Sequence, residues 1–235
     1  MEVISLLKLM KMELKKFPVS GYTRGALIAM AAILLFMILL FWTSILEGEN
    51  ILYTQVDCVD MVNILVNDVF LIFAAVMFSN YVIGEYSSGT INILFTYPIS
   101  RKKIIWSKIL LVCSFMVITM IVANVFILTS MHIINNYTNT IPVTTDAGLL
   151  STTALKIITN SIAFSLISTL CLYFGMLKKS KVATIVSSVI IVSIVGSTSN
   201  GFSLSSIIFI PLTIAFVGVS LIFFTFRKIE VLDVK

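Results

Sequence analysis

Six long apolar stretches dominate the sequence, and short polar segments separate them. A helix needs about 20 consecutive apolar residues to cross the hydrocarbon core of a bilayer. Within that core, only helices and closed barrels satisfy all their backbone hydrogen bonds. The sequence therefore predicts an all-α membrane protein with six transmembrane helices. The predicted spans cover about residues 25–46, 62–84, 104–131, 151–177, 182–197 and 207–226.

The composition excludes a water-soluble chain and leaves no room for a second domain. Hydrophobic residues make up 59% of the 235 positions, and charged residues make up 11%. A soluble domain is roughly 45–50% apolar and about 25% charged. Six spans and their loops use the chain, whereas a separate soluble domain typically takes about 100–150 residues. We expect a single transmembrane domain over residues 1–235 and exclude a soluble enzyme or a secreted disulfide scaffold.

The first 20 residues have a different pattern. Val3, Leu7, Met10, Leu14 and Phe17 recur at helical spacing, while three lysines share another face. An amphipathic helix of this kind lies in the membrane surface with its apolar face in the lipid. We therefore predict an amphipathic surface helix within residues 1–20, ended by the proline that follows Phe17.

The positive charges set the predicted orientation. With the N-terminus inside, 15 of the 16 Lys and Arg residues fall on the inner side. Lys156 alone falls on the outer side, near the start of the fourth span. Cytoplasmic loops of membrane proteins carry such an excess of Lys and Arg. We therefore expect a multi-pass protein of the cell membrane with both termini in the cytoplasm.

The segment between the second and third spans, residues 85–103, is unusual for a loop. Residues 90–95 (TINILF) are rich in apolar side chains, which need lipid or a partner to cover them when they lie at a surface. Residues 97–100 (YPIS) form a predicted turn, and three basic residues follow. A basic loop with no further role remains an alternative, but the pattern favours a short amphipathic helix on the cytoplasmic surface.

This segment resembles the membrane subunit of ABC-2 type ABC transporters, in particular the permeases of the bacitracin, lantibiotic-immunity and peptide-toxin exporter branch. The architecture of the whole chain agrees with that plan. The residues that carry the resemblance are Glu85, Gly89, Thr90, Pro98, Ile99, Ser100 and Arg101. The break between the fifth and sixth spans is short here, so the extracellular re-entrant helices usual in this fold are expected to be abbreviated.

The resemblance implies a role for both surface segments. The segment from about 86 to 97 would be the coupling helix that sits in a groove of the ATPase, and the N-terminal helix would be a connecting helix beside it. Glu85 would anchor the bend, with Arg101 as one candidate partner. The implied coupling residues are Glu85, Tyr86, Gly89, Thr90, Ile91, Leu94, Phe95, Pro98 and Arg101.

No nucleotide-binding motif accompanies this plan. None of the ten glycines is followed by Lys, so the chain has no Walker A phosphate loop. We therefore expect no cofactor on this chain and no enzyme activity of its own, with ATP and Mg²⁺ bound by a separate ATPase subunit. Implied partners are two ATPase copies, a second permease copy or paralogue, membrane lipid and a peptide substrate, with no nucleic acid and no metal.

Polar residues within the second and fifth spans are candidates for lining a translocation path. In the resembled family, these two spans line the cavity between two permease copies. Asp68 is the one acid well inside an apolar span, and intramembrane carboxylates are often functional. An acid at the membrane interface and serines that serve only close helix packing are the alternatives. The candidates are Asp68, Asn63, Asn67, Asn80, Ser187, Ser188 and Ser193.

Taken together, these features predict the permease of an ATP-driven exporter, in a bacterial membrane, that moves an amphipathic, antimicrobial or toxin peptide by alternating access. The substrate class comes from the resemblance alone. The alternative is a membrane interaction or sensory subunit that transports nothing and docks a cytoplasmic partner.

Overall fold

The computed structural model describes residues 19–47, 55–84, 101–138, 147–178, 180–196, 198–199, 202–203 and 209–232. Within these residues the fold is helical, as the sequence predicts. Its six α-helices correspond to the six apolar stretches, and a π-helical turn, η1 (Ser79–Ile83), directly follows the second of them. The α-helices are α2 (Val19–Glu47), α3 (Gln55–Phe78), α6 (Arg101–Thr138), α7 (Ala147–Lys178), α8 (Lys181–Val195) and α9 (Phe209–Leu232).

Four of the helices are long and apolar enough to cross a membrane. These spans are Ser20–Thr43, Cys58–Ile83, Ile104–Tyr137 and Ser151–Lys178. The apolar helical stretches Lys181–Val195 and Pro211–Phe223 are shorter. The six-span topology is therefore supported in part by helix length, and the crossing of α8 and α9 stays a prediction.

The helix boundaries extend beyond several of the predicted spans. The helix α2 is described from Val19, six residues before the predicted start at residue 25. The helix α3 likewise begins at Gln55 rather than residue 62. The predicted connecting helix within residues 1–20 lies outside the described residues, except for the start of α2.

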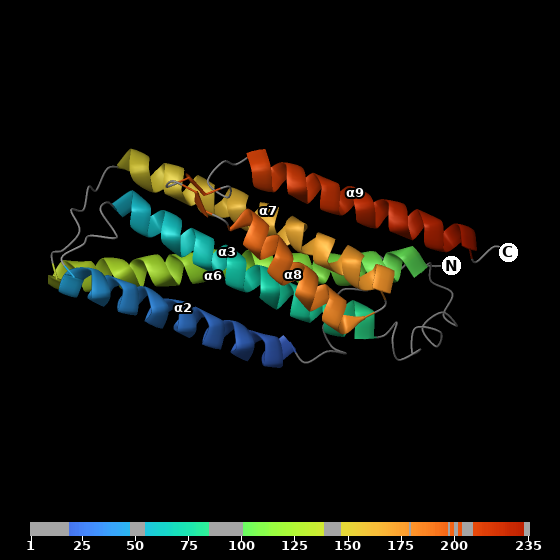
Figure 1. Cartoon of the computed structure of the whole chain (residues 1–235), viewed down its shortest axis with the longest axis horizontal. Coiled ribbons are helices and arrows are strands. Elements are labelled where there is room, and N and C mark those ends of the chain that lie inside the picture. The colour runs from blue at the N-terminus through green and yellow to red at the C-terminus, as the bar shows by residue number, and fades with distance from the viewer. Residues whose placement is uncertain are drawn as a thin grey trace, which may run out of the picture.

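Figure 1 shows the helices lying side by side along the long axis of the molecule, with successive helices running in opposite directions. The helix α3 packs against α2, α6, α7 and α8, and α7 packs in addition against α9. These contacts place α3 and α7 at the centre of the bundle. The starts of α2, α6 and α8 and the ends of η1, α7 and α9 lie toward one end, on the right in Figure 1.

The outer surface of the bundle is apolar. On α2, the side chains of Leu27, Ile28 and Trp42 are exposed, whereas Phe70 and Phe78 of α3 are fully buried. Large contiguous apolar surfaces are rare on soluble monomers. A lipid environment covers such a surface without cost, which agrees with a multi-pass membrane protein.

Two glycines allow close helix contacts. A Cβ atom on Gly175 of α7 would overlap the hydroxyl oxygen of Thr184 on α8 and lie 3.0 Å from the Cβ of Thr184. A Cβ atom on Gly218 of α9 would lie 2.9 Å from the Cγ of Leu170 on α7. Small residues let membrane helices approach closely and gain dispersion contacts, since lipid supplies little hydrophobic drive for helix association.

The predicted break after the fifth span contains a small antiparallel hairpin. The strands β1 (Thr198–Ser199) and β2 (Phe202–Ser203) pair with Thr198 opposite Ser203 and Ser199 opposite Phe202. Residues 197, 200, 201 and 204–208 of this connection lie outside the described residues, so the expectation of abbreviated re-entrant helices stays a prediction.

Candidate functional site

The predicted coupling residues lie outside the described residues. Only Arg101 has a described backbone, as the first residue of α6. The side chains concerned are those of Glu85, Tyr86, Gly89, Thr90, Ile91, Leu94, Phe95, Pro98 and Arg101. Their role in coupling therefore stays a prediction. The helical elements on either side of this segment, η1 and α6, are described, and their contacts are given below.

The π-helical turn η1 precedes the predicted coupling segment in the chain, and its residues Ser79, Tyr81, Val82 and Ile83 are buried. A π-helical turn is wider than an α-helical one, is rare, and is frequently found at functional sites. This turn is not evident from the sequence, because apolar periodicity does not distinguish one π turn at the end of an α-helix. Its position immediately before residue 85 makes it the inner end of the predicted second span.

A buried lysine connects α6 to η1. The side chain of Lys108 is only 3% exposed, and its Nζ donates a hydrogen bond to the backbone carbonyl of Tyr81 at 3.2 Å. A buried ammonium group is costly unless it is hydrogen-bonded. The contact therefore joins the two helices that flank the predicted coupling segment. The sequence analysis counted Lys108 only as a positive charge of the inner side, although its apolar neighbours on both sides signal a lysine within a span.

The helix α2 contacts the same turn through Tyr22. The Nδ2 of Asn80 donates a hydrogen bond to the Tyr22 hydroxyl at 3.2 Å. The rings of Tyr22 and Tyr81 lie with their centroids 5.1 Å apart. Side chains from α2 and α6 thus both contact η1, the turn that follows α3. Asn80, a predicted lining residue, is exposed and is bonded to α2.

The predicted lining residues do not gather on one face. On α3, Asn63 and Asn67 are buried between helices of the same chain, and Asp68 is half-buried. On α8, two of the three serines are buried and the third is exposed, and each hydroxyl donates to a backbone carbonyl one turn earlier. Such bonds satisfy a hydroxyl locally. These serines are Ser187, Ser188 and Ser193. A substrate path lined by these residues therefore stays a prediction.

Asn67 is the most unusual of these residues. Its side chain is 1% exposed, and neither amide atom has a hydrogen-bond partner in the described part of the chain. The neighbouring Asn63 donates from Nδ2 to the Val59 carbonyl at 3.0 Å but leaves its Oδ1 unpaired. Unpaired buried polar atoms are rare in proteins and each calls for a physical reason. These two side chains form a polar stripe inside the bundle that packing alone does not require.

We expect Asn67→Leu to raise the thermal stability of the purified protein. The change replaces an unpaired amide by an apolar group with the same branched shape and number of heavy atoms, and it removes a desolvation penalty of about 1–3 kcal/mol. Thermal unfolding in detergent measures the effect. Asn63→Leu is the matched control, with a smaller gain because it also removes the bond to the Val59 carbonyl. A lower melting temperature for Asn67→Leu would show that the amide has a stabilising partner.

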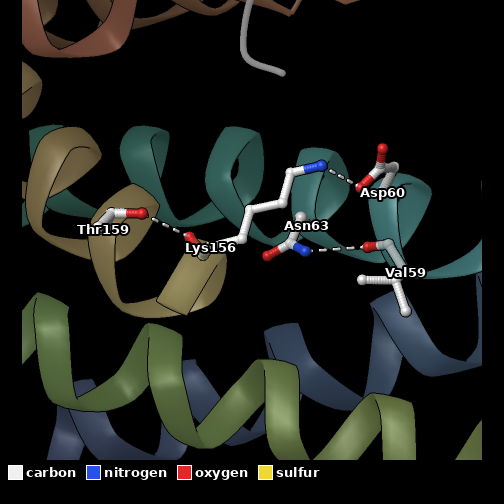
Figure 2. Close-up of polar contacts among 5 residues, drawn as sticks. All are labelled: Val59, Asp60, Asn63, Lys156 and Thr159. Carbon is white, nitrogen blue, oxygen red and sulfur yellow. Dashed lines mark hydrogen bonds and ion pairs between the residues drawn. The ribbon is translucent and has the colours of Figure 1, made fainter. Parts of the chain in front are cut away.

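At the opposite end of the bundle, an ion pair connects α3 and α7. Figure 2 shows Lys156 of α7 extending to Asp60 of α3, beside Asn63. The Nζ of Lys156 lies 2.5 Å from Oδ1 of Asp60, and the two side chains are 26% and 33% exposed. Lys156 is the one basic residue predicted on the outer side. Its exception to the positive-inside pattern therefore has a structural role, because a carboxylate on the neighbouring helix pairs with it.

Asp68 lies against the end of α8. A Cβ atom on Gly196, the C-cap residue of α8, would lie 2.7 Å from Oδ2 and 3.2 Å from Oδ1 of Asp68. The same point is 2.9 Å from the carbonyl oxygen of Val192. A glycine at position 196 leaves room for this carboxylate in its present orientation. The sequence analysis named Asp68 but not Gly196, since nothing in the sequence shows that the two meet.

Comparison with known proteins adds a family relationship. The model of a family described as "ABC-2 family transporter protein" matches residues 9–196 of this chain. The uncharacterized protein YcbO of Bacillus subtilis (strain 168) is 34% identical over 227 residues, which cover 97% of this chain and 98% of that protein. No solved structure matches the chain.

Proposed function

Because the chain belongs to the ABC-2 family of transporter proteins, we propose that it is the permease half of an ATP-driven exporter. It is a multi-pass membrane component of an ABC-2 type transporter. The family match over residues 9–196 is the observation that carries the proposal, because this range includes the segment between η1 and α6. The similarity to a Bacillus protein supports a bacterial cell membrane as its location.

The proposed mechanism starts at the segment between η1 and α6. A separate ATPase subunit, holding ATP and Mg²⁺, binds this segment and moves it when two ATPase copies close on nucleotide. The bond from Lys108 to the Tyr81 carbonyl supports joint movement of α3 and α6, because it connects the two helix ends that flank the segment. Tyr22 extends the same connection to α2 through Asn80. Movement of the segment between η1 and α6 would therefore be transmitted to α3, α6 and α2.

The working unit we propose has two permeases and two ATPase chains. ATP binding and hydrolysis shift the permease pair between inward-open and outward-open states, and transport follows because the two states differ in their affinity for the substrate. The proposed substrate is an amphipathic, antimicrobial or toxin peptide.

The first test is purification of the tagged chain in mild detergent, followed by mass spectrometry of the proteins that co-elute. We expect a stoichiometric chain with a Walker A motif. Purification of the chain alone, under several gentle conditions, would contradict an ABC pump. Stable binding of a signalling protein in place of an ATPase, with no transport of peptide in reconstituted vesicles, would favour the interaction subunit.

The second test addresses coupling. We expect Glu85→Ala and Gly89→Pro to reduce peptide-stimulated ATPase activity by at least about tenfold, because a lost charge-assisted contact or a broken helix interrupts the transfer of movement. Glu49→Ala is the matched control, since it removes an acid from the predicted outer loop and is expected to leave the activity unchanged. Normal stimulation in both coupling variants would show that this segment does not couple ATP hydrolysis to transport.

A further inference from the structure

The described helix α8 is shorter than the hydrocarbon core of a bilayer is thick. It has 15 residues, from Lys181 to Val195, and so measures about 22 Å along its axis. The hydrocarbon core of a bilayer is about 30 Å thick. Because α8 starts at the basic end of the bundle, its last turn lies at membrane depth. The carbonyl groups of a last helical turn lack partners within the helix and carry a partial negative charge.

A carboxylate lies at this same helix end. Asp68 is 13 residues after Gln55, where α3 begins, and this places it about 20 Å along the helix. The sequence analysis left open an acid at the membrane interface, and the earlier start of the helix places Asp68 deeper. Both Asp68 oxygens lie within 3.2 Å of the point where a Cβ of Gly196 would stand. The Val192 carbonyl lies 2.9 Å from the same point and accepts the Gly196 N–H at 2.7 Å, so the carbonyls without a partner within the helix are those that follow Val192.

The charges at this point are all of one sign. Asp68 has no hydrogen-bond donor and no cation partner among the residues that the structure describes. A carboxylate beside a helix C-terminus is electrostatically unfavourable, and a cation there is favourable. Intramembrane carboxylates are costly and mark functional sites. Helices that end within the membrane use their C-terminal carbonyls to bind cations in several transporter folds.

We propose that Asp68 and the C-terminal end of α8 form a recognition site for a primary ammonium or guanidinium group of the transported compound. This inference rests on the proposed function and narrows its substrate class to cationic amphipathic peptides. A resident metal ion is a poorer occupant. Within the described ranges no three or more His, Cys, Asp and Glu side chains cluster as metal ligands, whereas Ca²⁺ and Mg²⁺ prefer six or more oxygen ligands.

Gly196 is the second residue of this site. An alanine methyl group at position 196 would stand 2.7 Å from Oδ2 of Asp68, so the carboxylate would have to turn away from the end of α8. Asp68→Asn keeps the shape and removes the charge, whereas Gly196→Ala keeps the charge and displaces it. The two variants therefore test the charge and its position separately.

The experiment uses the full chain with its co-purifying subunits in nanodiscs of neutral phosphatidylcholine. The probes are a fluorescent amphipathic peptide of leucine and lysine and its counterpart with glutamine in place of every lysine. Fluorescence anisotropy measures the two dissociation constants. We expect the unaltered protein to prefer the lysine peptide by about tenfold or more, since a charge-assisted contact is lost with glutamine. Asp68→Asn and Gly196→Ala should reduce this preference to within about twofold, and Asp68→Glu should retain part of it.

Asp57→Asn is the matched control, because it removes a carboxylate from the first turn of the same helix. It should keep the preference for the lysine peptide. An unaltered protein that binds both peptides equally would overturn the inference, as would an unchanged preference in Asp68→Asn and Gly196→Ala. These results leave the proposed function intact when an active ATPase co-purifies. Absence of an ATPase would overturn the proposed function, while an Asp68-dependent preference would still support the recognition site.

Discussion

Gly175→Ala is expected to destabilise the protein by about 1–3 kcal/mol, because overpacking a tight contact forces neighbouring groups to shift. The added methyl group would overlap the hydroxyl oxygen of Thr184 and lie 3.0 Å from its Cβ. It would also lie 3.3 Å from Cδ1 of Ile83 in η1. The change therefore separates α7 from α8 at the point where both approach η1. Thermal unfolding of the purified chain in detergent measures the loss.

Two further variants show whether the contact with Thr184 is the cause. Gly21→Ala adds the same methyl group to α2 where no atom lies within 4 Å, and it should leave the melting temperature unchanged or raise it slightly. Thr184→Ala removes the hydroxyl that the new methyl group meets. The combination Gly175→Ala with Thr184→Ala should therefore recover part of the loss. A melting temperature like that of the unaltered protein for Gly175→Ala alone would contradict the close contact.

Lys156→Met is expected to destabilise the chain by about 1–3 kcal/mol, a value between those of exposed and buried ion pairs. The loss of stability arises because the Asp60 carboxylate would remain near the end of a membrane span without its cationic partner. Asp60→Asn should have a similar effect through the unpaired ammonium group. The yield of folded protein and its melting temperature measure both losses.

A double variant distinguishes the interaction between Asp60 and Lys156 from the separate effect of each side chain. Asp60→Asn with Lys156→Met removes both charges, and replacement of a whole ion pair by neutral groups is often tolerated. Its stability should exceed that of either single variant. Lys178→Met, which removes an exposed lysine from the last turn of the same helix α7, is the control and should change little. Equal losses in the double and single variants would show that the two side chains act independently.

Much of the fold follows from local chemistry that the sequence displays directly. Runs of apolar residues predict helices in lipid, and the six described α-helices correspond to the six predicted runs. The uneven distribution of Lys and Arg predicts the side of the membrane on which each loop lies. The family relationship could be anticipated from the motif around residues 85–101, and the match over residues 9–196 confirms it.

The candidate site was less predictable. The sequence analysis named Asp68, Asn63 and Asn67 as polar residues in a span, but their surroundings differ. Asn67 is fully enclosed without a hydrogen-bond partner in the described helices, whereas Asp68 meets the end of α8. Lys108 was counted only among the positive charges of the inner side, although its side chain is buried and hydrogen-bonded to Tyr81. Helical periodicity places a residue on a face, but it does not say which helix covers that face.

The amino-acid sequence by itself determined the helical membrane architecture, the charge asymmetry and the family, because hydrophobicity, charge and motif spacing are properties of local stretches of chain. Only the tertiary structure decided that Lys156 pairs with Asp60. It also decided that Gly175 packs closely against Thr184 and that Asp68 lies against Gly196. Each of these contacts joins residues on different helices. Such contacts depend on the rotation and depth at which two helices pack, and these are set by the fit of all their side chains together.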